Sequence, residues 1–167
     1  MRRVLALVGW LLAGPLLAAS PCESGPPAGA GQGVVLQLDF DGDGRQDRAW
    51  FLPAGALPDV RGRATDPWRR VQRPLDAQLA ALVVDRGRGA SACVLIQNRR
   101  FFATPIWEDG PPPVGVLQRS SAQARAWRGM TRGWRGEGVL LGTEAGVDLL
   151  LYWDGRQPRI AQGRDLP

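Results

Sequence analysis

Short apolar runs separated by turn residues dominate the chain beyond its N-terminal segment. The runs are partly β-branched and are bounded by Gly, Pro or Asp, a pattern that favours strands over helices. The Asp154-Gly155 pair accepts the positive φ values of a type I′ turn, so we expect a hairpin there. Together these signals predict strands at 34–38, 49–52, 82–84, 92–96, 114–117, 139–141, 147–153 and 157–161.

One helix is expected after Arg73. Pro74 suits a first helical position, and Leu75, Leu79 and Leu82 share one helical face. The remaining long stretches, 53–70 and 101–113, are expected to be loops, with the prolines at 111–113 as a stiff extended spacer. No repeat of solenoid or propeller length is present. The predicted fold is mainly β, an antiparallel sheet of about six to eight short strands with at most one short helix and no full propeller.

The N-terminal segment is typical of export signals. Arg2 and Arg3 precede an apolar run over 4–17, and small residues follow it. The run is shorter than the ~20 residues of a membrane span, although an uncleaved anchor is an alternative. We therefore expect a signal peptide over 1–19, with cleavage after Ala19, and a periplasmic or secreted protein.

The remainder of the chain divides into a tail and one domain. Residues 20–33 are rich in Pro, Gly and Ala and predict a flexible linker, so 34–167 form a single β-rich domain. Cys22 lies in the tail and Cys93 in an apolar run, and an oxidising compartment favours a disulfide between them. The alternative is a buried free Cys93 and a reactive or lipidated Cys22, although Pro21 makes a poor lipoprotein signal.

The most specific chemical feature is the acidic segment 39–47. It places carboxylates at loop positions 1, 3, 5 and 9 and a glycine, which permits a sharp turn, at position 6. Ca²⁺ takes six to eight oxygen ligands, whereas four uncompensated carboxylates in nine residues would repel one another. An EF-hand would need a Glu at position 12, where Trp50 stands, and a solvated acidic turn that binds no ion is the other alternative. The segment predicts a Ca²⁺ site formed by the side chains of Asp39, Asp41, Asp43 and Asp47 and the carbonyl of Arg45.

The spacing D-x-D-x-D-G-x-x-D resembles the calcium loops of the FG-GAP and VCBS-type repeats of integrin-like propellers and bacterial secreted proteins. The resemblance implies a loop that joins two β-strands and binds calcium through the same five residues. It covers residues 34–52, and the Tyr152-Trp153-Asp154-Gly155 segment is similar to the last strand of small exported bacterial proteins that carry one such loop. Propellers need many copies and this chain has one, so we expect the calcium to stabilise a hairpin.

A basic segment lies between Arg119 and Arg135. Arginine beside aromatic rings suits anionic glycans, lipid headgroups or nucleic acid, and export argues against nucleic acid. The alternative is that the arginines lie on a solvated face and the tryptophans in the core. The candidate anion-binding residues are Arg125, Trp127, Arg128, Arg132, Trp134 and Arg135.

Composition excludes several classes of enzyme. The chain has 167 residues, a net charge of +5 and no His, and all its 21 basic residues are Arg. Nucleophilic systems that need His, lysine Schiff bases and P-loops are thereby excluded. Carboxylate-dependent hydrolysis is a third hypothesis, and its candidate residues are Glu108, Asp109, Glu137, Glu144 and Asp148.

The sequence therefore favours an exported, non-catalytic calcium-binding protein. The alternative is a calcium-assisted module that binds glycans or anions through the basic segment. Its expected partners are an envelope glycan, an anionic polymer or another exported protein. Signal cleavage leaves 19 arginines against 16 acids, a net charge of +3.

Overall fold

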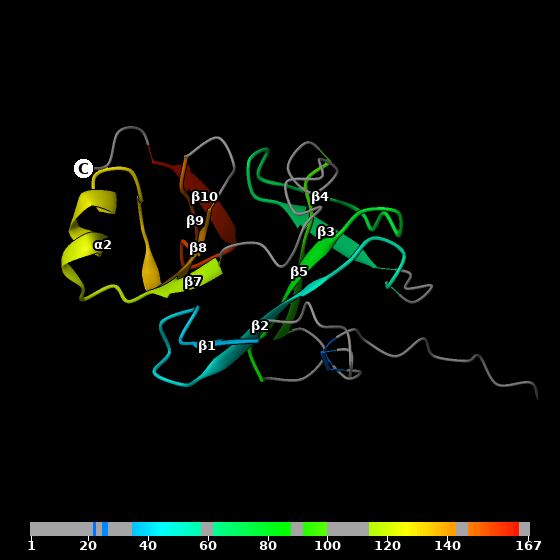
Figure 1. Cartoon of the computed structure of the whole chain (residues 1–167), viewed down its shortest axis with the longest axis horizontal. Coiled ribbons are helices and arrows are strands. Elements are labelled where there is room, and N and C mark those ends of the chain that lie inside the picture. The colour runs from blue at the N-terminus through cyan, green and yellow to red at the C-terminus, as the bar shows by residue number, and fades with distance from the viewer. Residues whose placement is uncertain are drawn as a thin grey trace, which may run out of the picture.

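Two β-sheets pack against each other in the computed structural model of this chain (Figure 1). The structure describes residues 22, 25–26, 35–57, 62–87, 92–99, 114–142 and 147–163. Within these ranges the chain forms ten strands and one short helix, so the prediction of a mainly β fold is confirmed. The strands are more numerous than expected because the loop predicted over 53–70 contains a strand, Arg63–Asp66, and a further strand covers Val71–Pro74.

Sheet A has six strands in the spatial order β1-β2-β5-β6-β3-β4. Neighbouring strands are antiparallel except β3 and β6, which run parallel and pair Thr65 with Ile96. In chain order the strands are β1 (Leu36–Leu38), β2 (Asp47–Leu52), β3 (Arg63–Asp66), β4 (Val71–Pro74), β5 (Ala81–Asp85) and β6 (Cys93–Ile96).

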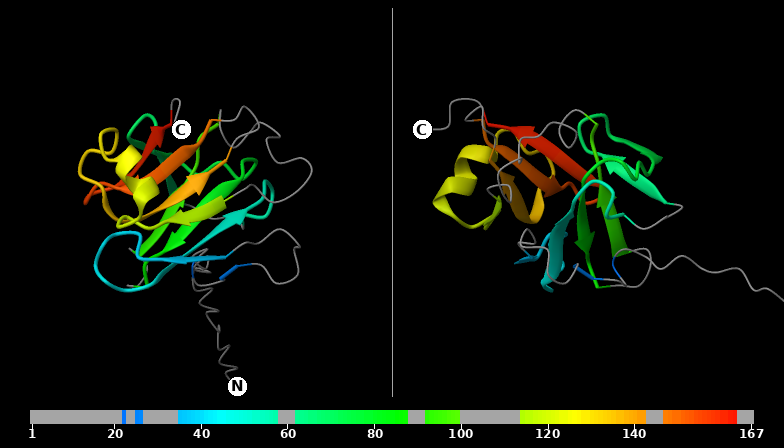
Figure 2. Two further views of the ribbon diagram at one scale, coloured as in Figure 1. Left: turned by 60° about the vertical axis from the view of Figure 1, so that its left-hand side comes forward. Right: turned by 45° about the vertical axis from the view of Figure 1, so that its right-hand side comes forward.

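Sheet B has four antiparallel strands in the order β10-β9-β8-β7. Helix α2 (Ala122–Trp127) connects the first two of these strands in the chain and lies on the side of the sheet that faces away from sheet A (Figure 2). The strands are β7 (Val114–Leu117), β8 (Arg135–Leu141), β9 (Leu149–Trp153) and β10 (Pro158–Gln162).

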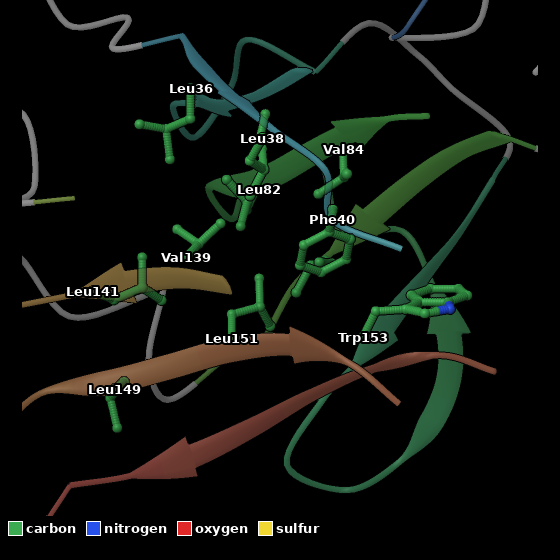
Figure 3. Packing of buried hydrophobic residues seen from close by; sticks show 12 residues of the cluster. Leu36, Leu38, Phe40, Leu82, Val84, Val139, Leu141, Leu149, Leu151 and Trp153 are labelled. Atoms are coloured by element: carbon green, nitrogen blue, oxygen red, sulfur yellow. The ribbon is translucent and has the colours of Figure 1, made fainter. Parts of the chain in front are cut away.

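The central strands are buried on both faces, which explains their continuous apolar runs. In β5, Leu82 and Val84 point into the core between the sheets, whereas Val83 points to the opposite face of sheet A. In β9 all five residues are buried, and Leu151 enters the same core between the sheets (Figure 3). This inter-sheet core comprises Leu36, Leu38, Phe40, Ala49, Leu82, Val84, Ile96, Val139, Leu141, Leu149, Leu151 and Trp153.

The prediction of a helix after Arg73 is wrong. Val71–Pro74 is strand β4, a turn follows in which the Leu79 amide donates to the Asp76 carbonyl, and Ala81–Asp85 is strand β5. Leu82 pairs with residues of β2 and β6 at the centre of sheet A, and this burial outweighs the local helical spacing of the leucines.

The helix that does form, α2, was missed. Ser121 caps it, since its Oγ accepts a hydrogen bond of 3.1 Å from the Ala124 amide. The helix buries Ala124 and Trp127 against sheet B. The available signal was a serine followed by alanines and, six residues later, by a tryptophan. This segment is short for a helix.

The hairpin at Asp154-Gly155 is confirmed, but its predicted type I′ turn is wrong. Trp153 pairs with Pro158, so the loop has four residues, and Gly155 has φ 93° while Asp154 does not have positive φ. The Asp154 carboxylate accepts hydrogen bonds from the amides of Arg156 and Gln157, which closes the wider turn.

The disulfide is confirmed. Cys22 and Cys93 are bonded, with their Cα atoms 5.7 Å apart, and both pack against the apolar cluster on the outer face of sheet A. The predicted signal peptide, most of the linker and the loop predicted over 101–113 lie outside the described residues. Within the described part of the chain, no helix has the length and apolar character to cross a membrane.

Candidate metal centre

The acidic segment forms the loop that connects β1 to β2. Leu38 pairs with Asp47, so the residues between them leave one strand and return along the other. Gly42 and Gly44 have φ of 78° and 84°, values that favour glycine and allow the loop to turn sharply. A β-hairpin with this loop at its tip agrees with the flanking strands that the sequence predicts.

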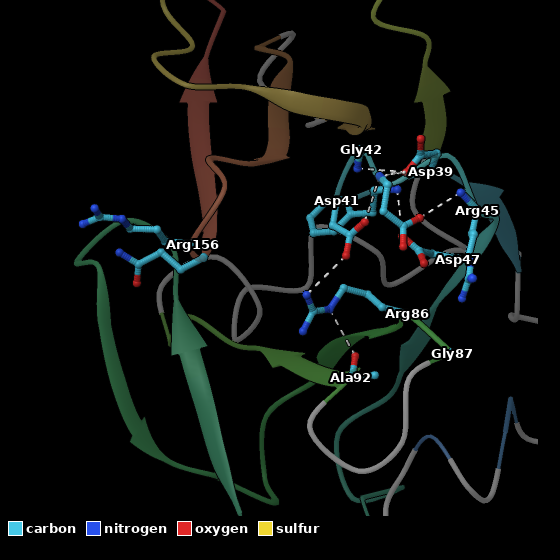
Figure 4. Close-up of polar contacts among 12 residues, drawn as sticks. Asp39, Asp41, Gly42, Arg45, Asp47, Arg86, Gly87, Ala92 and Arg156 are labelled. Atoms are coloured by element: carbon cyan, nitrogen blue, oxygen red, sulfur yellow. Dashed lines mark hydrogen bonds and ion pairs between the residues drawn. The ribbon is translucent and has the colours of Figure 1, made fainter.

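Backbone amides of this loop bond three of its carboxylates, and Figure 4 labels two of them, Asp39 and Asp41. Asp39 Oδ1 accepts from the amides of Gly42 and Asp43 at 2.9 and 3.0 Å, and its Oδ2 accepts from Gly44 at 3.0 Å. Asp41 Oδ1 accepts from the Asp43 amide at 3.2 Å, and Asp43 Oδ1 accepts from the Arg45 amide at 2.8 Å. The loop backbone therefore fixes the orientation of all three side chains.

The three carboxylates are close enough to share one cation. One oxygen from each of Asp39, Asp41 and Asp43 lies within 4.8 Å of the others. Calcium–oxygen distances are about 2.3–2.6 Å, so ligands on opposite sides of one ion are separated by about twice that value. This donor set of hard oxygens fits Ca²⁺.

Asp47, the fourth predicted side-chain ligand, lies outside this group. It is only 2% exposed, and its Oδ2 accepts a 2.8 Å hydrogen bond from the Phe40 amide. Burial, with the charges of Asp41 and Asp39 as lesser causes, raises the pKa of Asp47 to about 6. The structure thus shows that Asp47 braces the base of the loop. Its role as a ligand stays a prediction, as does that of the Arg45 carbonyl.

The second sheet holds this loop by two hydrogen bonds between Glu137 and the backbone of Asp39, which the sequence did not indicate. The Asp39 amide donates to Glu137 Oε2 at 2.9 Å, and the Glu137 amide donates to the Asp39 carbonyl at 2.6 Å. Gly136 precedes Glu137 in β8 and has φ 61°, and a Cβ there would lie 2.2 Å from the Asp39 carbonyl oxygen. The loop and β8 can approach this closely only because position 136 is a glycine.

Arg86 links the loop to two further segments. Its Nη1 lies 3.4 Å from Asp41 Oδ2, and its Nε donates to the Ala92 carbonyl at 3.4 Å (Figure 4). Its guanidinium lies 4.7 Å from the centre of the Trp153 ring, a cation–π contact with β9. Nothing in the spacing of the sequence indicates Arg86, because it meets Asp41 only through the order of the strands.

The fold places the tryptophans and the arginines of the basic segment in different surroundings. Trp127 and Trp134 are 0% and 4% exposed and pack in the core beneath α2. Their rings therefore have no exposed face on which a ligand could stack, which agrees with the alternative that they are core residues. The candidate arginines of this segment, Arg125, Arg128, Arg132 and Arg135, are exposed.

Of the five carboxylates considered for hydrolysis, the structure describes Glu137 and Asp148. Glu137 bonds the backbone of Asp39, and Asp148 is exposed immediately before β9. Glu108, Asp109 and Glu144 lie outside the described residues.

The chain was also compared with other proteins. Comparisons with known protein families, with curated proteins and with solved structures found no match.

Proposed function

We propose that this chain is an exported, non-catalytic calcium-binding protein whose ion is mainly structural. The observation that carries the proposal is the group of three carboxylates, with oxygens within 4.8 Å of one another, on a loop bonded to the second sheet. Asp39, Asp41 and Asp43 would hold the ion, and the Arg45 carbonyl and Asp47 are the further predicted ligands.

The ion would act on the junction between the sheets. Three like charges at this separation repel one another, and a bound divalent cation would replace that repulsion with attraction. The loop contacts β8 through Gly136 and Glu137, and it contacts β9 indirectly through Arg86. Calcium would therefore stabilise the packing of sheet A on sheet B.

Export is supported by the disulfide and by the N-terminal signal pattern. Disulfides such as that of Cys22 and Cys93 persist in oxidising compartments outside the cytoplasm. Such compartments also contain more free calcium than the cytosol typically does, so a site of modest affinity can be filled there.

Calorimetry and thermal unfolding test the proposal. We expect Ca²⁺ added to EDTA-stripped protein to release or absorb heat at one site and to raise Tm. At a ligand concentration of a hundred times Kd, the free energy of unfolding should rise by about 2.7 kcal/mol. Asp43→Asn should weaken binding by about tenfold or more, because it removes one of the site's charges. Asp148→Asn, an exposed carboxylate outside the loop, is the matched control and should bind normally.

Absence of both the heat and the Tm shift would overturn the proposal. Equal calcium affinity in Asp43→Asn and the unchanged protein would also overturn it, since binding would then lie elsewhere. Asn keeps an oxygen that can accept the hydrogen bond from the Arg45 amide, so this variant should retain the loop conformation.

A further inference from the structure

A cleft of about 410 Å³ opens at the end of sheet A that carries the β3–β4 hairpin. Its walls are the hairpin, the turn before β5 and the residues that follow β6. Three arginines line it: Arg69 and Arg73 belong to the hairpin, and Arg99 follows β6. Its apolar lining comes from Ala64, Pro74 and Leu79.

Two of the three guanidinium groups form long ion pairs with acids of the cleft, and neither pair is a hydrogen bond. Arg73 Nε lies 4.0 Å from Asp66 Oδ2, and Arg99 Nη2 lies 3.6 Å from Asp76 Oδ2, both longer than a hydrogen bond. In the described part of the chain, the Arg69 side chain makes no hydrogen bond or ion pair. These donors are available to a ligand.

The two acids of the lining compete weakly with an incoming anion. The Asp66 side chain is 6% exposed, and its Oδ1 accepts from the Trp68 and Arg69 amides and from Asn98 Nδ2 at 3.0–3.1 Å. Asp76 lies at the rim, where its Oδ1 accepts from the Gln78 amide. With three arginines against two acids, the cleft has a net positive charge.

The walls are held by buried polar bonds, so the cleft is formed before a ligand arrives. Gln97 is 6% exposed, and its side chain donates to the carbonyls of Asp76 and Leu79 and accepts from the Asp76 amide at 3.1 Å. The Gln97 amide also donates to the Thr65 carbonyl, which joins the turn before β5 to β3.

We propose that this cleft binds a small organic anion, with a carboxylate or phosphate group held by Arg69, Arg73 and Arg99 and an apolar part against Ala64, Pro74 and Leu79. Planar guanidinium groups pair with either headgroup through two parallel hydrogen bonds. The volume lies within the range of small-molecule sites. This site is separate from the calcium loop, and the proposal does not depend on calcium.

Nuclear magnetic resonance titration of the purified protein tests this site. Benzoate and phenyl phosphate are the probes, because each joins a ring to one of the two headgroups, and benzamide is the neutral comparison. We expect saturable shifts of the Arg69, Arg73 and Asn98 amides with at least one anion at millimolar concentration or below, and weaker shifts with benzamide. The anion that binds more tightly identifies the headgroup.

A pair of charge-matched variants completes the test. Arg69→Gln should weaken binding of the preferred anion by about tenfold, the loss of one charge-assisted pair. Arg156→Gln removes the same charge from an exposed position in the turn between β9 and β10, outside the cleft, and should bind as the unchanged protein does. Arg69 is exposed, and equal Tm values would show that the variant folds.

Three results would overturn the proposal. The first is the absence of saturable shifts with both anions, and the second is an equal response to benzamide. The third is an equal loss of affinity in Arg69→Gln and Arg156→Gln, which would indicate attraction to overall charge instead of a site.

Discussion

The contact between Gly136 and the acidic loop makes a sharp prediction about stability. Replacing Gly136 with Ala places a Cβ at 2.2 Å from the Asp39 carbonyl oxygen, 2.6 Å from the Gly42 nitrogen and 2.8 Å from the Phe40 carbonyl oxygen. All three atoms belong to the backbone, so no side-chain rotation relieves the overlap. The loop must withdraw by about 0.8 Å even to reach a separation of 3.0 Å, the shortest that Cβ atoms adopt.

The expected loss has two parts. A residue with a Cβ at φ 61° costs about 1–2 kcal/mol relative to glycine. Forcing an extra carbon into packed backbone costs about 1–3 kcal/mol more, because the loop withdraws and its two hydrogen bonds with Glu137 lengthen. We therefore expect Gly136→Ala to lower the free energy of unfolding by about 2–5 kcal/mol.

Two other glycines separate these contributions. Gly44 has φ 84° and an open space where a Cβ would be, so Gly44→Ala should lose only the backbone part, about 1–2 kcal/mol. Gly115 in β7 has open space and no positive φ, so Gly115→Ala should be neutral or stabilise by up to about 1 kcal/mol.

Urea unfolding in EDTA is the assay, so that calcium binding does not contribute to the measured stability. The reasoning predicts the order Gly115→Ala, Gly44→Ala, Gly136→Ala from most to least stable. If Gly136→Ala is no less stable than Gly44→Ala, the close approach of the loop to β8 is refuted.

Three further perturbations have expected outcomes. Cys93→Ser opens a disulfide that spans 71 residues and should lower the free energy of unfolding by about 4 kcal/mol, measured by urea unfolding. Arg86→Gln removes the ion pair with Asp41 and the contact with the Trp153 ring, and should lower it by about 1–2 kcal/mol in EDTA. Although burial acts to raise the pKa of Asp154, hydrogen bonds from the Gln157 amide and the Arg159 side chain leave it lowered. Its stabilising contribution is therefore present above the unfolded pKa of about 3.9 and is lost as the pH falls through the folded pKa. Asp154→Asn should therefore reduce the loss of unfolding free energy that the unchanged protein shows on acidification, which is the acid limb of its stability curve.

Each of these has a control and a contradicting result. For the disulfide, dithiothreitol should lower the stability of the unchanged protein and leave Cys93→Ser unaffected; equal sensitivity would contradict it. For Arg86, the exposed Arg125→Gln should have little effect, and an equal loss in both would contradict a specific contact. For Asp154, the exposed Asp148→Asn should retain the acid limb, and an unaltered limb in Asp154→Asn would contradict the assignment.

The strands that could be predicted from the sequence are mostly those at the sheet centres. β5 and β9 are buried on both faces, so their composition alone marks them as apolar runs. β3 and β4 carry charged and polar residues, and β4 is exposed throughout, so no apolar pattern could indicate them. The parallel pairing of β3 with β6 orders these strands, and that pairing joins segments far apart in the chain.

The candidate site likewise has one part that the sequence predicts and another that it does not. The acidic loop is encoded in nine consecutive residues, because turn glycines and bonds from its own amides orient the carboxylates locally. Glu137 was considered for catalysis, yet it bonds Asp39 across 98 positions of the chain. Sequence spacing has no information about contacts of that separation.

The sequence by itself determined the β class, the acidic loop and the pairing of the two cysteines. These follow from burial patterns, from bonds among near neighbours and from the presence of two thiols in one chain. Only the tertiary structure decided that Gly136, Glu137 and Arg86 surround the loop, that the tryptophans of the basic segment are buried, and that Arg69, Arg73 and Arg99 share a cleft. The physical reason is that these contacts depend on the spatial order of the strands, and that order is set by packing of the whole chain.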